Sequence, residues 1–239
     1  LSQASSVVVL GEGMKQTLID TKKVDSEIIN IIPVWAMPEF DADQKPDLET
    51  KDRFGISDKE FVVLFAGNMG IMQPTDHVID AAERLRGCDV RFLFLGGGVG
   101  FEQISDLVIK KKLSNVTVLP YQPLSEFGNL LLTSDACIVT LTDGMEKLSV
   151  PSRAYTFMSA GKPVIAIMNP HSDVANLITS TKSGWVIGNG VELAKLLELH
   201  GSNNGESNKR GMNASECYRS GFTKQSAIQK FSHLICQIS

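Results

Sequence analysis

A proline followed by a hydroxyl and a guanidinium is the feature of this sequence most suited to chemistry. Pro151 is expected at the first position of a helix, where its missing N–H costs nothing, with Ser152 and Arg153 in the first turn. The N–H groups of a first helical turn have no partner within the helix. Free N–H donors beside a hydroxyl and a guanidinium favour an anion, so this segment predicts a phosphate-binding site.

The residues after this helix predict a turn and then a strand. Gly161 is expected to end the helix in the left-handed conformation, and an apolar run follows it. Similar short runs alternate with segments whose apolar residues recur at helical spacing, which indicates a parallel sheet covered by helices. Most runs lack apolar–polar alternation, as expected for strands buried on both faces. The predicted strands are 6–10, 28–33, 61–66, 90–95, 116–119, 136–140, 163–167 and 184–187.

The expected fold is therefore α/β, a Rossmann-like parallel sheet with helices on both faces. Thr75 is expected to cap one of the helices. Two segments, 36–49 and 201–209, predict irregular structure, because the first is acidic with two prolines and the second is rich in Asn, Ser and Gly. Further helices are expected over 174–180, 192–200, 212–219 and 223–238.

Two of the predicted strands run into loops that contain glycine. Gly67 and Gly70 follow the strand 61–66, at the sheet edge where doubly wound folds bind ligands. Glycine lets a backbone approach a phosphate closely, although an ordinary strand-to-helix turn needs glycine as well. Residues 96–100 repeat the arrangement, but Phe101 occupies the place of the last glycine in the dinucleotide-binding fingerprint. The phosphate-loop motif of nucleotide triphosphatases is also absent from the sequence.

An aromatic residue follows a third strand at the same predicted edge. Tyr121 comes after the strand 116–119 and could present its ring to a nucleobase, while a surface turn with an ordinary aromatic explains it equally well. The three loops would converge on one crevice with Arg153. Convergence of this kind favours a nucleotide-sugar site.

Composition sets limits on the class of protein. The 239 residues carry a net charge of −4, which argues against a broad nucleic-acid surface. The 4 cysteines form no C-x-x-C pair, so neither a disulfide framework nor a zinc site is expected. No apolar run reaches membrane-spanning length. The chain starts at Leu1 and leads directly into a strand, so we expect a fragment of a longer protein.

The ordered motifs resemble the C-terminal, donor-binding half of a GT-B glycosyltransferase of family 4, the glycosyl transferases group 1. The matching segments are 65–70, 94–98, 115–120 and 151–165, and the G-N-x-G and P-S-R sequences are nearest a surface-polysaccharide subset. The resemblance implies transfer of a sugar from a UDP- or GDP-sugar to an acceptor hydroxyl, in surface polysaccharide or glycoconjugate biosynthesis.

The resemblance also implies which residues contact the donor. Residues 68–70 would approach the pyrophosphate and the sugar, and Gly98 would line the crevice. Ser152 and Arg153 would bind phosphate, and Arg153 would neutralise charge on the leaving diphosphate, a role that requires no metal and no cofactor. The implied donor-site positions are Asn68, Met69, Gly70, Gly98, Tyr121, Ser152, Arg153 and Thr156.

Two positions depart from the family pattern. Many members carry two glutamates eight positions apart, where this chain has Leu148 and Thr156. Thr156 could bond a ribose hydroxyl, though helix packing explains it equally well. The departures leave open two rivals: a non-catalytic nucleotide-sugar-binding or partner domain, and a nucleotide-sugar epimerase-like enzyme.

By resemblance, the chain divides into three parts. Residues 1–24 would end an N-terminal acceptor domain, 25–220 would form the nucleotide-sugar-binding domain, and 221–239 would form a helix crossing back toward the missing N-terminal domain. That missing domain would hold a sugar or lipid-linked acceptor, so the chain is expected to be inactive without it. No nucleic acid and no membrane span are expected. The implied location is cytoplasmic, and a peripheral position at the inner membrane face stays open.

Overall fold

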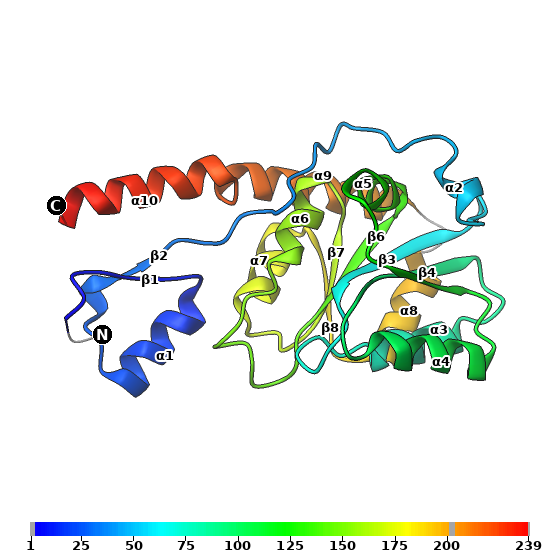
Figure 1. The fold of residues 1–239 in the computed structure, drawn as a ribbon, viewed down its shortest axis with the longest axis horizontal. Coiled ribbons are helices and arrows are strands. Elements are labelled where there is room, and N and C mark those ends of the chain that lie inside the picture. The colour runs from blue at the N-terminus through cyan, green and yellow to red at the C-terminus, as the bar shows by residue number, and fades with distance from the viewer. Residues whose placement is uncertain (1–2, 201–203, 239) are drawn as a thin grey trace.

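A six-stranded parallel sheet forms the centre of the larger of two lobes (Figure 1). The computed structural model describes residues 3–200 and 204–238. The strand order is β5-β4-β3-β6-β7-β8, and each neighbouring pair is parallel. The strands are β3 (Phe61–Asn68), β4 (Val90–Gly97), β5 (Val116–Pro120), β6 (Ala136–Thr140), β7 (Val164–Ile167) and β8 (Gly184–Ile187).

Helices cover both faces of this sheet, which is why its strands are apolar throughout. Every residue of β3 except the last, Asn68, is buried. One face packs against α3 (Asp76–Arg84), α4 (Phe101–Lys111) and α8 (Gly190–His200). The other packs against α5 (Leu124–Thr133), α6 (Arg153–Ser159), α7 (Asp173–Thr181) and α9 (Asn204–Gly221). The predicted fold class is confirmed.

A small lobe precedes the large one. Strands β1 (Val7–Val9) and β2 (Ile29–Ile31) pair in parallel, joined by α1 (Glu12–Lys22) and a 3₁₀ turn over Ser26–Ile28. The last helix, α10 (Lys224–Ile238), leaves the large lobe and runs alongside the small one (Figure 1). Ile32 packs against Ala227 and Leu234 of α10, so the two ends of the chain share one apolar cluster.

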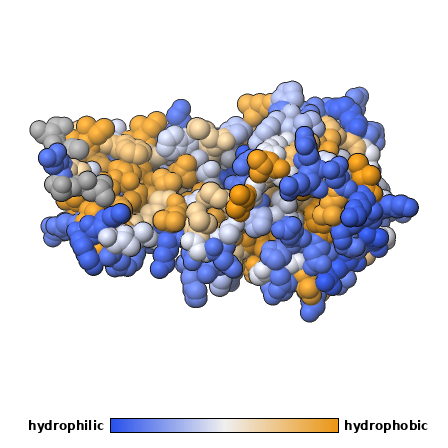
Figure 2. Space-filling model, turned by 60° about the horizontal axis from the view of Figure 1, so that its bottom comes forward, coloured by the Kyte–Doolittle hydropathy of each residue, from blue (hydrophilic) through white to orange (hydrophobic). Residues whose placement is uncertain are grey.

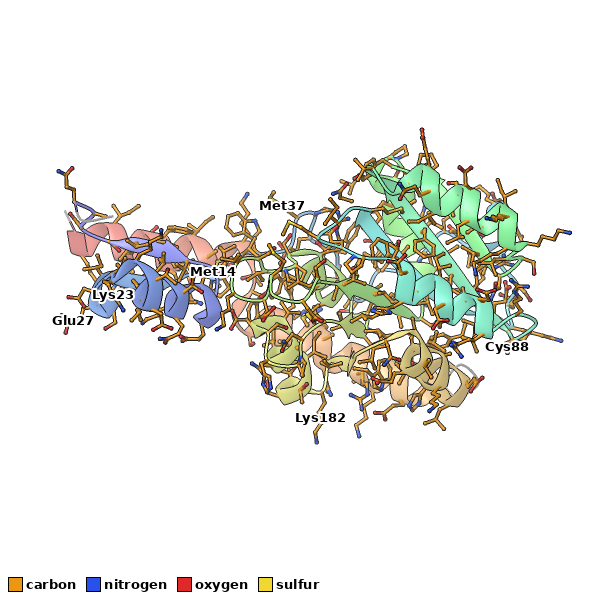
Figure 3. All side chains as sticks on the ribbon, turned by 90° about the horizontal axis from the view of Figure 1, so that it is seen from below. Met14, Lys23, Glu27, Met37, Cys88 and Lys182 are labelled. Atoms are coloured by element: carbon orange, nitrogen blue, oxygen red, sulfur yellow. The ribbon has the colours of Figure 1, made fainter. Side chains whose placement is uncertain are left out.

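The lobes also meet where α1 begins. The N–H of Gly13 donates to the Asp173 carboxylate at 3.2 Å, and Asp173 itself begins α7. A Cβ on Gly11 would lie only 2.2 Å from the same carboxylate oxygen. A side chain at position 11 would therefore displace the Asp173 carboxylate from this junction. Figure 3 labels Met14, the next residue along α1, at this junction.

The predicted strands are all present, and the helix boundaries need two corrections. Pro151 lies before α6 rather than inside it, because Ser152 is the N-cap. Helix α9 starts at Asn204, so the expectation of irregular structure was wrong for 204–209; residues 201–203 lie outside the described residues. An ion pair between Glu206 and Arg210, at 2.8 Å, stabilises this first part of α9. Residues 36–49 lack regular structure, as expected.

Among residues 3–200 and 204–238, no helix combines the length and the hydropathy that crossing a bilayer requires.

The depth of the core gives a direct test of the fold. Leu93 in β4 is 1% exposed, whereas Leu199 in α8 is 70% exposed. Leu93→Ala should lower the free energy of unfolding by about 2–5 kcal/mol, because it leaves a cavity in a packed core. Urea denaturation followed by circular dichroism measures the change. Leu199→Ala, the same substitution at the surface, should change it by less than about 0.5 kcal/mol; equal effects would contradict the described core.

Candidate anion-binding cleft

The carboxyl ends of β3 and β6 open into a cleft of about 530 Å³. The loop after β3, the loop after β6 and the start of α6 form its walls. This is the edge at which open parallel sheets bind ligands. The cleft is lined by Phe65, Ala66, Gly67, Asn68, Gly70, Ile71, Met72, Gln73, Val99, Ile138, Val139, Thr140, Leu141, Ser149, Val150, Pro151, Ser152 and Arg153.

The guanidinium of Arg153 lies half-buried on the wall of this cleft. It packs over Gly67, where a Cβ would lie 3.3 Å from Nη2, and its carbon lies 5.8 Å from the centre of the Phe127 ring. Burial lowers the pKa of Arg153, and among the described residues no carboxylate forms an ion pair with it. Keeping a partly desolvated charge without a counter-ion costs free energy. A bound anion offsets that cost by forming strong charge-assisted hydrogen bonds.

Glycines bring the strand ends together beside Arg153. Gly67 and Gly96 have φ values of +140° and +151°, a region that side chains disfavour. A Cβ on Gly96 would lie 1.9 Å from the carbonyl oxygen of Gly67. Gly96 is therefore required by the close approach of β3 and β4. Gly67 also leaves the space that the guanidinium occupies.

The loop after β3 is fixed by its own backbone. The N–H of Met69 donates to Gly97 at 2.6 Å, its carbonyl accepts from Gly100 at 2.8 Å, and its side chain is fully buried. Met69 therefore holds the loop in place and offers no free group to a ligand. Gly98 has φ +106°, and a Cβ there would lie 2.1 Å from Oδ1 of Asn68. The Asn68 side chain is exposed and lines the cleft.

The structure brings four of the eight sequence-predicted donor residues into the cleft lining: Asn68, Gly70, Ser152 and Arg153. The hydroxyl of Ser152 is exposed and makes no capping bond. Of the four outside the lining, Met69 and Gly98 support the loop. Tyr121 is 63% exposed, with its ring against Gly97, and Thr156 is only 1% exposed. The Thr156 side chain therefore faces the core, which agrees with the packing interpretation.

Sequence reasoning missed a hydroxyl at the base of the cleft. Thr140 ends β6, lines the cleft and is 2% exposed, and its Oγ1 has no hydrogen-bond partner among the described residues. A polar residue at the carboxyl end of an otherwise apolar strand was the available signal. Next to it, Thr142 donates to the carbonyl of Ile71 at 2.6 Å, which ties together the loops on the two sides of the cleft.

All four cysteines are free, and burial raises the pKa of the Cys137 thiol to about 12. Figure 3 labels Cys88 at the end of the large lobe distant from the small lobe. Within the part of the chain that the structure describes, no group of three or more His, Cys, Asp or Glu is arranged to hold a metal ion.

The fold and the cleft together define a Rossmann-like protein with a cleft at the carboxyl ends of its strands and the Arg153 guanidinium on the cleft wall. Residues 47–216 match the family model described as glycosyl transferases group 1. The chain belongs to this family.

Relatives of known name agree with this family. The chain is 28% identical to the probable glycosyltransferase WbjE of Pseudomonas aeruginosa, over 82% of this chain and 50% of WbjE. It is 23% identical to the putative colanic acid biosynthesis glycosyl transferase WcaI of Escherichia coli K12, over 74% of this chain and 44% of WcaI. The chain thus spans about half the length of these curated relatives.

A solved structure shares the fold. The Anabaena protein HepE, crystallised in complex with UDP and glucose, superposes with a TM-score of 0.80 at 17% identity, over 98% of this chain and 64% of HepE. The GT-B architecture expected from the sequence is therefore confirmed.

The loop geometry predicts that Gly98 is needed for anion binding. Gly98→Ala should weaken binding of inorganic pyrophosphate by about tenfold or more, because the new Cβ displaces Asn68 and the loop around it. Isothermal calorimetry measures the affinity. Gly87 also has a positive φ, +79°, but has open space around it, so Gly87→Ala carries similar backbone strain without the displacement. Equal loss in both variants would contradict the role given to this loop.

Proposed function

We propose that the chain is the donor-binding half of a glycosyltransferase that moves a sugar from a nucleotide-sugar to an acceptor hydroxyl, in surface polysaccharide or glycoconjugate biosynthesis. The observation that carries the proposal is the half-buried Arg153 guanidinium, which has no carboxylate partner among the described residues and lies on the cleft wall. The family, the colanic acid name of WcaI and the UDP and glucose bound to HepE support it.

Arg153 acts on the leaving group. As the bond between the sugar and the diphosphate breaks, negative charge grows on the phosphate oxygens. A guanidinium held in place by Gly67 and Phe127 stabilises that charge without having to reorganise. The hydroxyl of Ser152, one residue earlier and free of any capping bond, adds a donor to the same phosphate.

The remaining cleft residues hold the rest of the donor. The exposed amide of Asn68 and the backbone of Gly70 lie beside the diphosphate position. The Thr140 side chain closes the base of the cleft, with its Oγ1 buried and without a partner among the described residues. The ring of Tyr121, exposed and packed against Gly97, borders the base.

A non-catalytic nucleotide-sugar-binding domain is the second candidate. Leu148 is 59% exposed in the loop before α6, and Thr156 faces the core. Neither position offers a carboxylate to the sugar or the ribose. This observation fits a site that binds a nucleotide-sugar without turning it over, and transfer activity separates the two candidates.

The small lobe and α10 belong to the acceptor side of a two-domain enzyme. Residues 1–24 and 221–239 form the ends of the chain, and the apolar cluster of Ile32, Ala227 and Leu234 joins α10 to the small lobe. Figure 2 shows hydrophobic residues gathered over this lobe. Ile228 and Ile235 of α10 are 51% and 57% exposed, an apolar surface suited to the rest of an acceptor domain.

Titration with nucleoside diphosphates tests the donor site. One of UDP and GDP should bind the chain at micromolar to millimolar affinity, and Arg153→Ala should weaken that binding by about tenfold or more, because a charge-assisted contact is lost. Isothermal calorimetry measures both, with NAD as a nucleotide expected not to bind.

Arg84→Ala serves as the matched control, since Arg84 is a surface arginine paired with Asp80 at 3.1 Å. It should leave the affinity unchanged. Equal binding by the wild type and the Arg153→Ala variant would refute the donor site.

Activity tests the division into two halves. Residues 1–239 alone should transfer no sugar from radiolabelled UDP- or GDP-sugars to endogenous lipid or polysaccharide acceptors, because acceptor-binding groups are lacking. Because the chain spans half the length of WbjE, a longer protein that joins it to an acceptor domain should transfer sugar, and Arg153→Ala in that longer protein should abolish transfer. An extended protein that binds the diphosphate but never transfers sugar would favour the binding-domain candidate.

A further inference from the structure

The segment that leaves the small lobe passes over two helices of the large lobe. Residues 36–53, called the strap from here on, run over α6 and α5 and end in the short helix α2 (Thr50–Arg53) (Figure 1). Residues 36–49 lack regular structure. A segment without its own backbone ladder keeps its course only through contacts with its neighbours, and those contacts converge on four consecutive residues of α5.

Polar contacts fix the second half of the strap to α5. The N–H of Asp47 donates to Oδ1 of Asn129 at 3.2 Å, and Arg53 forms an ion pair with Glu126 at 2.9 Å. Within the strap, Arg53 also pairs with Asp47 at 2.6 Å. Each of these partly exposed contacts alone is weak. Together they hold the strap against one turn of α5.

One aromatic side chain of the strap packs into the same turn of α5. The Phe40 ring meets the Phe127 ring edge-to-face, with the centroids 5.6 Å apart and an angle of 70° between the ring planes. A Cβ on Gly128 would lie 2.9 Å from Cε1 of Phe40. Glycine is unfavourable inside a helix, and at position 128 its missing side chain makes room for the Phe40 ring.

The backbone of Phe40 is held by the helix that carries Arg153. The N–H of Phe40 donates to Oγ of Ser159 at 3.0 Å, and this buried hydroxyl donates to the carbonyl of Thr156 at 2.8 Å. Ser159 and Thr156 both belong to α6, whose first residue is Arg153. Phe40 therefore bridges two helices, because its ring contacts α5 and its backbone contacts α6.

The Phe127 ring in turn lies beneath the Arg153 guanidinium. Phe127 is 7% exposed, and the guanidinium carbon lies 5.8 Å from the centre of its ring. A cation is attracted to the face of an aromatic ring, so the orientation of the ring affects where the guanidinium rests. Among the described residues, no hydrogen bond or ion pair holds this guanidinium. Its position therefore depends on packing against Gly67 and Phe127.

We propose that Phe40 and Phe127 are positioning residues for the anion site. The strap fixes Phe40, Phe40 fixes the Phe127 ring, and the ring holds the Arg153 guanidinium in place. Neither phenylalanine lines the cleft, so their effect on a ligand passes through Arg153. The consequence for donor binding rests on the proposed function, whereas the ordering of the guanidinium does not.

The order of the Arg153 side chain tests the positioning without any ligand. The Nε–Hε signal of Arg153 is assigned in the whole 239-residue chain by its loss in Arg153→Ala, and ¹⁵N relaxation gives its order parameter. This parameter should be about 0.8 in the wild type and below about 0.6 in Phe40→Leu and Gly128→Ala. Alanine favours a helix more than glycine does, so lost order in Gly128→Ala cannot come from a weaker α5.

Matched controls remove a phenylalanine and a glycine elsewhere. Phe231 is 36% exposed on α10, and Gly221, the last residue of α9, has open space around it. Phe231→Leu and Gly221→Ala should leave the order parameter of Arg153 unchanged. The proposal is overturned if Arg153 stays equally ordered in Phe40→Leu and Gly128→Ala.

Calorimetry with inorganic pyrophosphate tests whether the positioning serves a ligand. Phe40→Leu should weaken binding by about threefold to tenfold, and it should have no further effect in the Arg153→Ala background, because its effect passes through the guanidinium. Equal weakening in both backgrounds would indicate a general loosening of the cleft and would overturn the proposal. A wild type that does not bind pyrophosphate would refute the donor site, and the order parameter alone would then decide the positioning.

Discussion

The arrangement of the large lobe around its cleft depends on one positive charge, the Arg153 guanidinium, which has no ion-pair partner among the described residues. Arg153 begins α6, and its guanidinium lies between Gly67 and the Phe127 ring, away from bulk water and without a carboxylate among the described residues. A partly buried charge without a counter-ion can be maintained only if the surrounding residues are rigid and an anion is bound to it for much of the time. The positive-φ glycines that end β3 and β4 and the buried Met69 supply that rigidity. The cleft therefore depends on backbone positions more than on polar side chains.

Much of the architecture was predictable, because it follows from periodicity. Strands buried on both faces are continuous apolar runs, and each of the eight was predicted near its observed position. The loops were predicted to converge near Arg153 because parallel strands bring their carboxyl ends to one edge, and the family resemblance implied Asn68, Gly70 and Ser152 as donor contacts there. Thr140 was missed because one hydroxyl at a strand end carries no pattern. The first turns of α9 were missed because a sequence rich in Asn, Ser and Gly has low helix propensity, which tertiary packing and an ion pair overcame.

The two ends of the sheet carry cavities whose linings differ in chemistry. At the carboxyl edge, the guanidinium and the free backbone favour an anion, and the surrounding side chains include the apolar Ile71 and Val99. At the amino edge, a second cavity of about 890 Å³ is lined by charges of both signs, Lys162 and Arg219 with Asp43, Asp135 and Glu216. No single-position signal distinguishes these edges in the sequence. The difference arises because α9, distant along the chain, packs against the turn before β7.

The chain passes between the lobes twice, near residues 33–36 and again at the turn between α9 and α10. Together with the hydrogen bond from Gly13 to Asp173, these two crossings hold the small lobe against the large one. Phe222 lies at the second crossing, and its ring stacks on the ring of Tyr155, with the two centroids 4.8 Å apart. Tyr155 is two residues from Arg153 on α6. The contacts that fix the course of the chain into α10 therefore extend to α6, the helix whose first residue is Arg153.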